Sequence, residues 1–289
     1  MGYVRFMFDP YSSSRQVTSD GVSLCVTDHG PTDGVPVLLL HGFPDSARLW
    51  RRQIPALADA GYRVLAPDMR GFGRSDRPEA VEAYAIHSLV ADVAAVMEGA
   101  GCETAHVVGH DWGAAVAWAV AMALPTRVRT LTAVSVGHPA AFAAAGIPQR
   151  EKSWYMLLFQ FEGVAEAWLS GGDWKWMKEW SGEPVDTDLW IEDLSRPGAL
   201  RAALNVYRAN TNPARMAASL QRPPQVACDV MGVWSDGDRF LLESQMVGSG
   251  AFVDGEWRYE RIDGASHWLP VDAPDEFNAL LLDWFGSHG

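Results

Sequence analysis

The sequence predicts an α/β protein with a mostly parallel sheet flanked by helices and an inserted helical segment. Two observations support this prediction. Short, continuous apolar runs alternate with segments of helical periodicity over residues 35–136, as expected when buried parallel strands are connected by helices. The alternation stops after Gly137 and resumes near Val226, so a segment of another kind separates two parts of one core.

Each element is predicted from its own pattern. Val35 to Leu40 is apolar throughout and ends at His41-Gly42, as a buried strand followed by a turn would. In the helix over residues 86–97, Leu89, Val93 and Val96 share one face. Pro274 suits the first turn of the final helix, over residues 274–285. Further strands are predicted over 62–66, 105–108, 128–136, 226–234 and 257–262, and further helices near 50–58 and 114–124.

The segment from 138 to 215 contains no strand-like run and is rich in tryptophan. Glycines and prolines divide it into short helical stretches. We therefore predict core residues 1–137, a helical cap or lid over 138–215, and core residues 216–289. Most of the tryptophans are expected to form the small core of the cap, and a few are expected to line an apolar pocket. These tryptophans are Trp154, Trp168, Trp174, Trp176, Trp180 and Trp190.

The composition excludes several partners. The formal net charge of −13 argues against nucleic acid and against an anionic membrane surface. No apolar run approaches the length of a membrane span, and residues 1–15 do not have the pattern of a signal peptide. The three cysteines are widely spaced, which predicts neither a disulfide framework nor a metal site. We expect a cytoplasmic protein without metal or cofactor; its oligomeric state is open, and a homo-oligomer is possible.

The most informative motif is Gly109-His110-Asp111-Trp112-Gly113, between a predicted strand and a predicted helix. Gly-x-nucleophile-x-Gly at a strand-to-helix turn is the pattern of a nucleophile elbow. The central residue is here an aspartate, where serine is common. Asp111 would also suit a plain helix N-cap, but the flanking glycines and the preceding strand favour the elbow.

Further features follow Asp111 in the order nucleophile, acid, histidine that is typical of α/β-hydrolases. Asp236 and Asp238 end a predicted strand, and His267 follows the last one. Upstream, His41-Gly42-Phe43-Pro44 follows the strand expected to supply a second oxyanion donor. Together these features predict a hydrolase with a carboxylate nucleophile.

Over residues 17–285 the chain resembles the epoxide hydrolases of the α/β-hydrolase fold, whose two signature motifs match residues 41–44 and 109–113. Residues 153–160 and 204–208 resemble the lid segments that each supply a tyrosine in that family, here Tyr155 and Tyr207. The family pattern Trp-x-x-x-Asp-Arg-Phe-Leu favours Asp238 over Asp236 as the acid, with Asp236 left as a turn residue. Without the family pattern, the tyrosines would be interpreted as ordinary aromatic core residues.

The residue types suit a reaction in two steps. A carboxylate can open an epoxide and form an alkyl ester on Asp111, with Tyr155 and Tyr207 as donors to the leaving oxygen. His267, oriented by Asp238, would then activate water to attack that ester. The backbone N–H groups of Phe43 and Trp112 are the expected oxyanion hole. A small apolar or aromatic epoxide is the expected substrate, and the expected pocket walls are Phe43, Trp112, Trp154 and Trp268.

Three other functions were weighed. A haloalkane dehalogenase shares the fold, the nucleophile and the histidine, and Trp112 could bind the halide. Related dehalogenases, however, usually have asparagine at the position of Phe43, and a halide needs no tyrosine pair. A non-catalytic ligand-binding protein is disfavoured by the intact set of Asp111, Asp238 and His267. Serine-type ester hydrolysis is disfavoured by the aspartate itself.

Overall fold

The computed structural model describes residues 8–213 and 223–288. Its centre is an eight-stranded sheet with the strand order β1-β2-β4-β3-β5-β6-β7-β8. The pairs β1–β2 and β2–β4 are antiparallel, and all other neighbours are parallel. The strands are β1 (Ser14–Ser19), β2 (Val22–His29), β3 (Pro36–Leu40), β4 (Arg63–Pro67), β5 (Ala105–His110), β6 (Val128–Val134), β7 (Asp229–Gly237) and β8 (Trp257–Ser266).

The predicted α/β architecture is confirmed, with small shifts at the strand ends. The largest shift is at the end of β8, which runs to Ser266 where the prediction ended at residue 262. Strand β7 begins later than predicted, at Asp229, because Val226 instead forms an isolated bridge with Val253. The antiparallel strands β1 and β2 were not predicted. Strand β1 lies at the sheet edge and buries only Val17 and Ser19, so its apolar pattern is weak.

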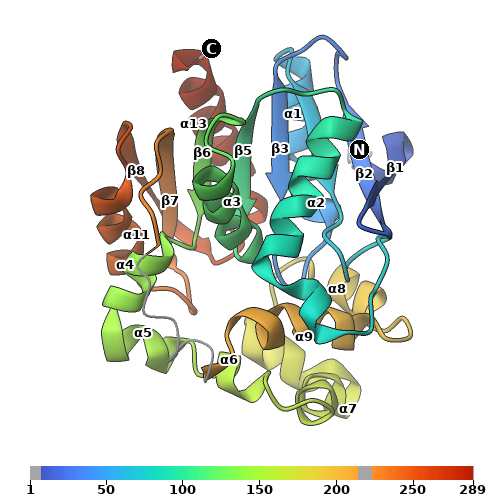
Figure 1. The fold of residues 1–289 in the computed structure, drawn as a ribbon. Helices are drawn as coiled ribbons and strands as arrows, with labels where there is room; N and C mark the ends of the chain where they lie inside the picture. The colour runs from blue at the N-terminus through green and yellow to red at the C-terminus, as the bar shows by residue number, and fades with distance from the viewer. Residues whose placement is uncertain (1–7, 214–222, 289) are drawn as a thin grey trace, which may run out of the picture.

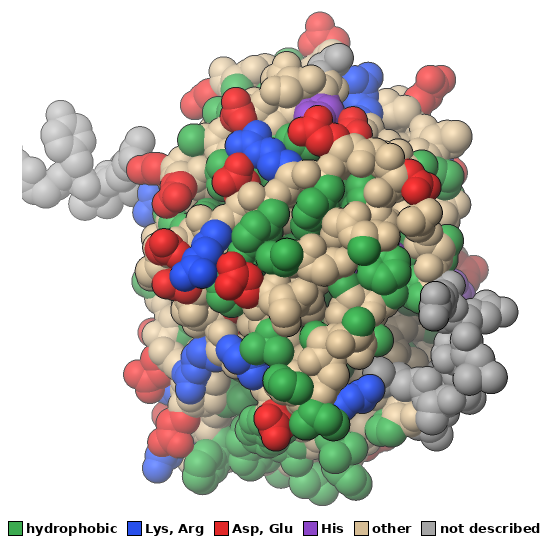
Figure 2. Space-filling view, turned by 90° about the vertical axis from the view of Figure 1, so that its left-hand side faces the viewer, with side chains coloured by type: hydrophobic (Ala, Val, Ile, Leu, Met, Phe, Trp, Pro, Cys, Tyr) green, Lys and Arg blue, Asp and Glu red, His purple; other side chains and the backbone are tan. Residues whose placement is uncertain are grey.

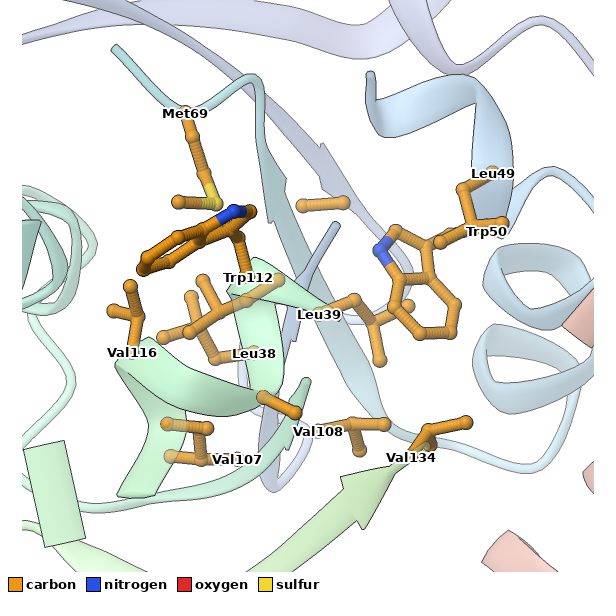
Figure 3. Close-up of a cluster of buried hydrophobic side chains, with 14 of the residues drawn as sticks. Leu38, Leu39, Leu49, Trp50, Met69, Val107, Val108, Trp112, Val116 and Val134 are labelled. Atoms are coloured by element: carbon orange, nitrogen blue, oxygen red, sulfur yellow. The ribbon is translucent and has the colours of Figure 1, made fainter. Parts of the chain in front are cut away.

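The core forms on both faces of the central parallel strands, as Figure 3 shows. Leu38 and Leu39 of β3 pair in register with Val107 and Val108 of β5, and all of them are fully buried. Successive side chains of a strand point to opposite faces, so each strand supplies both layers of the core. In Figure 3 Trp112 lies on one side of these strands, next to Met69 and Val116, and Trp50 lies on the other.

Helices cover both faces of the sheet (Figure 1). Helix α2 (Ile86–Gly99) contacts α3 (Trp112–Ala123) on one face, and α1 (Gln53–Asp59) contacts α13 (Pro274–Ser287) on the other. The remaining helices of the core are short: η1 (Pro10–Ser13), η2 (Ala47–Trp50), η3 (Val81–Tyr84), α11 (Glu243–Val247), η4 (Gly248–Phe252) and α12 (Leu269–Asp272). Among the described residues, no helix is both long enough and apolar enough to span a bilayer.

A helical cap lies between β6 and β7 in the chain and below the sheet in Figure 1. Its last helix packs on η3 of the core, where Ala202 and Ala209 contact the buried ring of Tyr84. The predicted cap boundary at residues 215 and 216 lies outside the described residues. The cap helices are α4 (Pro139–Ala144), α5 (Gly146–Lys152), α6 (Tyr155–Leu158), α7 (Val164–Ser181), α8 (Thr187–Leu194) and α9 (Ala199–Asn210).

Polar contacts attach the start of α8 to the core beside η2. Arg51 and Asp186 form a bidentate ion pair with N–O distances of 2.7 and 2.6 Å, and both side chains are less than a tenth exposed. The indole N–H of Trp190 donates to Oδ1 of Asp45 at 2.9 Å. Burial and the neighbouring Asp186 charge raise the pKa of Asp45 well above its usual value. Arg51 is therefore a buried cation in an acidic setting between core and cap.

We expect Arg51→Met to lower the free energy of unfolding by about 3–5 kcal/mol, because Asp186 would remain buried without a counter-charge. The double variant Arg51→Met/Asp186→Leu should recover most of that loss. Urea denaturation monitored by circular dichroism measures both effects. Arg48→Met is the control, because its partner Glu192 is 65% exposed and such a pair contributes about 0–1 kcal/mol. A loss no larger than that of the control would contradict the prediction.

Candidate active site

Asp111 occupies a strained turn between β5 and α3. Its φ of 54° and ψ of −120° lie outside the regions that side-chain-bearing residues normally adopt, a strain of order 1–3 kcal/mol. A side chain at Gly109 would collide with the backbone of Gly113, and one at Gly113 would collide with the backbone of Leu40. The two glycines therefore permit the tight approach of β3, β5 and α3 that holds Asp111 in place.

The carboxylate of Asp111 does not cap α3 through its side chain. Instead, Oδ1 accepts a hydrogen bond of 2.8 Å from the backbone N–H of Phe43. The backbone N–H of Trp112 contributes to lowering the pKa of the same carboxylate. A side chain at Gly42 would collide with this carboxylate. Burial raises the pKa of Asp111, but hydrogen bonding and charge from His267 outweigh burial and lower it. Asp111 is thus an ionised carboxylate held by a backbone hydrogen bond from Phe43.

His267 lies between two carboxylates. Its Nδ1 is 2.8 Å from Oδ2 of Asp238, and its Nε2 is 3.6 Å from Oδ2 of Asp111. The other oxygen of Asp238 accepts bonds from the backbone N–H groups of Phe240 and Leu241. Asp236 points elsewhere: it accepts from the Gly264 N–H at 2.7 Å and lies 3.7 Å from Arg261. The acid that the structure brings to His267 is therefore Asp238.

The charge state of His267 depends on these neighbours. Burial lowers the pKa of His267, but the charges and hydrogen bonds of Asp238 and Asp111 outweigh burial and raise it to about 10. His110 also faces the ring, with centroids 4.7 Å apart, and its Nε2 is 2.9 Å from the backbone oxygen of His267. Burial, followed by the His267 charge, lowers the pKa of His110 to about 3. The site therefore contains a protonated His267 beside a neutral His110.

Tyr155 and Tyr207 come from the cap, on α6 and α9, and meet next to Asp111. Both are at most 4% exposed, and their ring centroids are 6.1 Å apart. The ring of Tyr207 packs edge to face on Trp112 at 5.1 Å and on Phe43 at 5.5 Å. Burial and the charge of Asp111 raise the pKa of both tyrosines well above the usual value. Two phenols that stay protonated therefore lie in the field of one carboxylate.

Three of the predicted pocket walls, Phe43, Trp112 and Trp268, are buried in the aromatic layer around these groups. The prediction that Trp154 is a pocket wall was wrong. Its side chain is 52% exposed and packs on Trp168, with ring centroids 5.9 Å apart. Successive residues of a helix point about 100° apart, so where Tyr155 faces inward Trp154 faces outward. Figure 2 shows hydrophobic side chains gathered at the lower end of the molecule, where the cap lies.

Further aromatic residues complete this layer, none of which was named individually as a pocket wall from the sequence. Phe159 and Trp180 pack on Tyr155 at 5.4 and 5.1 Å, and Phe240 packs on both Tyr155 and His267. Trp190 packs on Trp268. Phe159 had a signal, because it lies four residues after Tyr155 and so on the same helical face. Trp180 and Trp190 had none beyond the general abundance of tryptophan in the cap.

Comparisons with known proteins show the family to which the chain belongs. The model of the α/β hydrolase fold family matches residues 35–274. Epoxide hydrolase B of Mycobacterium tuberculosis is 50% identical over 91% of this chain and 94% of its own length. Epoxide hydrolase A of the same organism is 34% identical over 94% and 97%. The crystal structure of epoxide hydrolase A from Mycobacterium thermoresistibile, 31% identical, has a TM-score of 0.82 and covers 94% of this chain and 97% of that one.

The raised pKa of His267 predicts how stability depends on pH. The folded state keeps a proton that the unfolded chain loses near the ordinary value of 6.5, so this contribution is complete below that pH and is lost towards about 10. We expect the free energy of unfolding to fall from about pH 7 to about pH 10, and to fall less in His267→Gln. Urea titrations of both proteins across this range measure the difference, and parallel curves would contradict the assignment.

Proposed function

Because this chain belongs to the epoxide hydrolases of the α/β-hydrolase fold, we propose that it converts an epoxide and water into a vicinal diol. One observation carries the proposal: an ionised Asp111 lies next to the His267–Asp238 pair, and its charge acts on two buried phenols, those of Tyr155 and Tyr207. Each group needed for opening the epoxide and for resolving an ester is thereby within one aromatic enclosure.

The first step forms an ester. An oxygen of Asp111 attacks one epoxide carbon, a new C–O bond forms, and the ring C–O bond breaks with its electron pair on oxygen. Tyr155 and Tyr207 donate a hydrogen bond or a proton to that oxygen as its charge develops. Their raised pKa keeps both hydroxyls protonated and available as donors.

The second step hydrolyses the ester. Esterification removes the charge of Asp111, one of the two carboxylates that raise the pKa of His267, so the imidazolium gives up its proton. That proton replaces the one that the tyrosines give to the opened oxygen, and the neutral imidazole is then able to act as a base. His267 takes a proton from water, and the hydroxide attacks the carboxyl carbon of Asp111. The oxyanion forms at the donors of Phe43 and Trp112, each of which is worth about 3–4 kcal/mol by analogy with subtilisin. Collapse of this intermediate releases the diol and restores the carboxylate.

The enclosure supports a small apolar or aromatic epoxide as substrate. The aromatic side chains around the catalytic groups include Phe43, Phe159, Trp180 and Phe240, which pack on one another. A cytosolic location is supported by the free thiols of Cys25, Cys102 and Cys228, since thiols persist in a reducing compartment.

Replacing His267 by glutamine should separate the two steps. Asp111 stays able to attack, but no base activates water, so styrene oxide should leave a covalent adduct on the variant. Intact-mass spectrometry followed by peptide mapping should place the adduct at Asp111. The wild-type protein should form the phenyl diol without accumulating the ester.

A halogenated alkane is the comparison substrate for this experiment. Halide release from it by the wild-type protein, together with no diol from aryl or alkyl epoxides, would contradict the proposal and favour a dehalogenase. Absence of the adduct in a folded His267→Gln protein would contradict the two-step mechanism.

The tyrosine pair should govern the first step. With Tyr155 and Tyr207 both replaced by phenylalanine, adduct formation in the His267→Gln background should slow by roughly 10²- to 10⁴-fold, because the leaving oxygen loses its donors. Quenched-flow sampling with mass spectrometry measures the rate. Tyr84→Phe is a matched control, since Tyr84 is buried and donates to Pro78 O between core and cap. An unchanged rate in the double variant would refute the role of the tyrosines.

A further inference from the structure

A buried glutamine connects the cap to the loop that carries Asp238. Gln149 lies on α5 and is 1% exposed. Its Oε1 accepts from the backbone N–H of Leu242 at 2.9 Å, and its Nε2 donates to the backbone oxygen of Phe240 at 2.8 Å. The same Nε2 donates to Oγ of Ser153 at 2.8 Å. One amide from the cap therefore binds two peptide groups of the core loop.

These peptide groups belong to the loop that fixes Asp238. Oδ1 of Asp238 accepts from the N–H groups of Phe240 and Leu241 at 2.8 and 2.9 Å, while Oδ2 faces Nδ1 of His267. Gln149 thus binds the two peptide groups that follow these donors: the carbonyl oxygen of Phe240 and the N–H of Leu242, which comes directly after Leu241. Lys152, also on α5, adds a bond of 2.7 Å from Nζ to the backbone oxygen of Asp238.

The other side of Gln149 leads to Tyr155. Ser153, which accepts from Gln149, directly precedes the turn that starts α6, where the Met156 N–H donates to the Ser153 oxygen at 3.0 Å. The ring of Phe240 packs on both Tyr155 and His267, with ring-centroid distances of 5.4 and 5.2 Å. A shift of the loop would therefore move Asp238 and Phe240 together.

We propose that Gln149 is a positioning residue: by holding the loop from Asp238 to Leu242, it keeps Asp238 aligned on His267 and so supports hydrolysis of the ester on Asp111. This inference rests on the proposed function for its effect on turnover, but the alignment itself can be measured in the free protein. Its main effect is on the second step, because attack by Asp111 does not require the Asp238–His267 bond.

The test replaces Gln149 by methionine, which has a similar length and no hydrogen-bonding amide. We expect ester hydrolysis in single turnover with styrene oxide to slow by roughly 10- to 100-fold, as misalignment of a catalytic group does. Ester formation should slow much less, so the adduct accumulates. In the free protein, NMR titration should show the pKa of His267 falling from its raised value, since the aligned Asp238 charge is what raises it most.

Gln245→Met is the matched control. Gln245 is also fully buried and also binds two backbone groups, accepting from the Gly137 N–H at 2.6 Å and donating to the Ser135 oxygen at 2.9 Å. It should lose comparable stability without adduct accumulation and without a change at His267. If Gln149→Met does not fold, Gln149→Glu is the second variant. It retains the acceptor for Leu242 but has no donor for Phe240, and its ester hydrolysis should be slower than that of the wild type.

The outcomes separate the two proposals. A wild-type protein that forms no diol refutes the proposed function, whatever the titration shows. A folded Gln149 variant with an unchanged pKa of His267 and unchanged ester hydrolysis refutes the positioning role, as would equal effects in the Gln149 and Gln245 variants.

Discussion

The contact between the carboxylate of Asp111 and the backbone N–H of Phe43 joins the two strands on which the site depends. It can form only because β3 and β5 lie side by side and because Gly42, Gly109 and Gly113 have no side chains to keep the turns apart. The unfavourable φ of Asp111 is maintained by packing of the surrounding parallel strands, all deeply buried. The packing energy of the sheet therefore offsets the backbone strain at Asp111, the proposed nucleophile.

The second constraint is electrostatic. A single imidazole lies between two buried carboxylates. Asp111 accepts a hydrogen bond from the backbone N–H of Phe43, and Asp238 accepts from those of Phe240 and Leu241. Buried charges are costly unless they are paired and hydrogen-bonded. The two carboxylates and their donors lie on chain turns that follow β3, β5 and β7. The ends of three parallel strands therefore stabilise the charges of Asp111, Asp238 and His267 together.

Much of this arrangement could be predicted from the sequence, because parallel strands leave continuous apolar runs and because the turns at their ends carry recognisable residues. The elbow at Asp111 is such a case, with strand, glycines and helix all local. The choice of Asp238 over Asp236 depended on a family pattern, and only the fold brings His267, 29 residues later, to one of them. Trp154 was misplaced because tryptophan alone does not reveal which face of a short helix is inward. Gln149 gave no signal, since its partners Phe240 and Leu242 lie about 90 residues away in the chain.

The aromatic layer around Asp111 should bind the epoxide substrate and the diol product with different strength. An epoxide has one ether oxygen and no hydrogen-bond donor, so it can be enclosed by Phe43, Phe159, Trp180 and Phe240 at little cost in lost hydration. A diol has two hydroxyl groups, each of which needs partners once it is removed from water. Such an enclosure retains the reactant more readily than the product, so release of the diol is favoured by the same side chains that admit the epoxide.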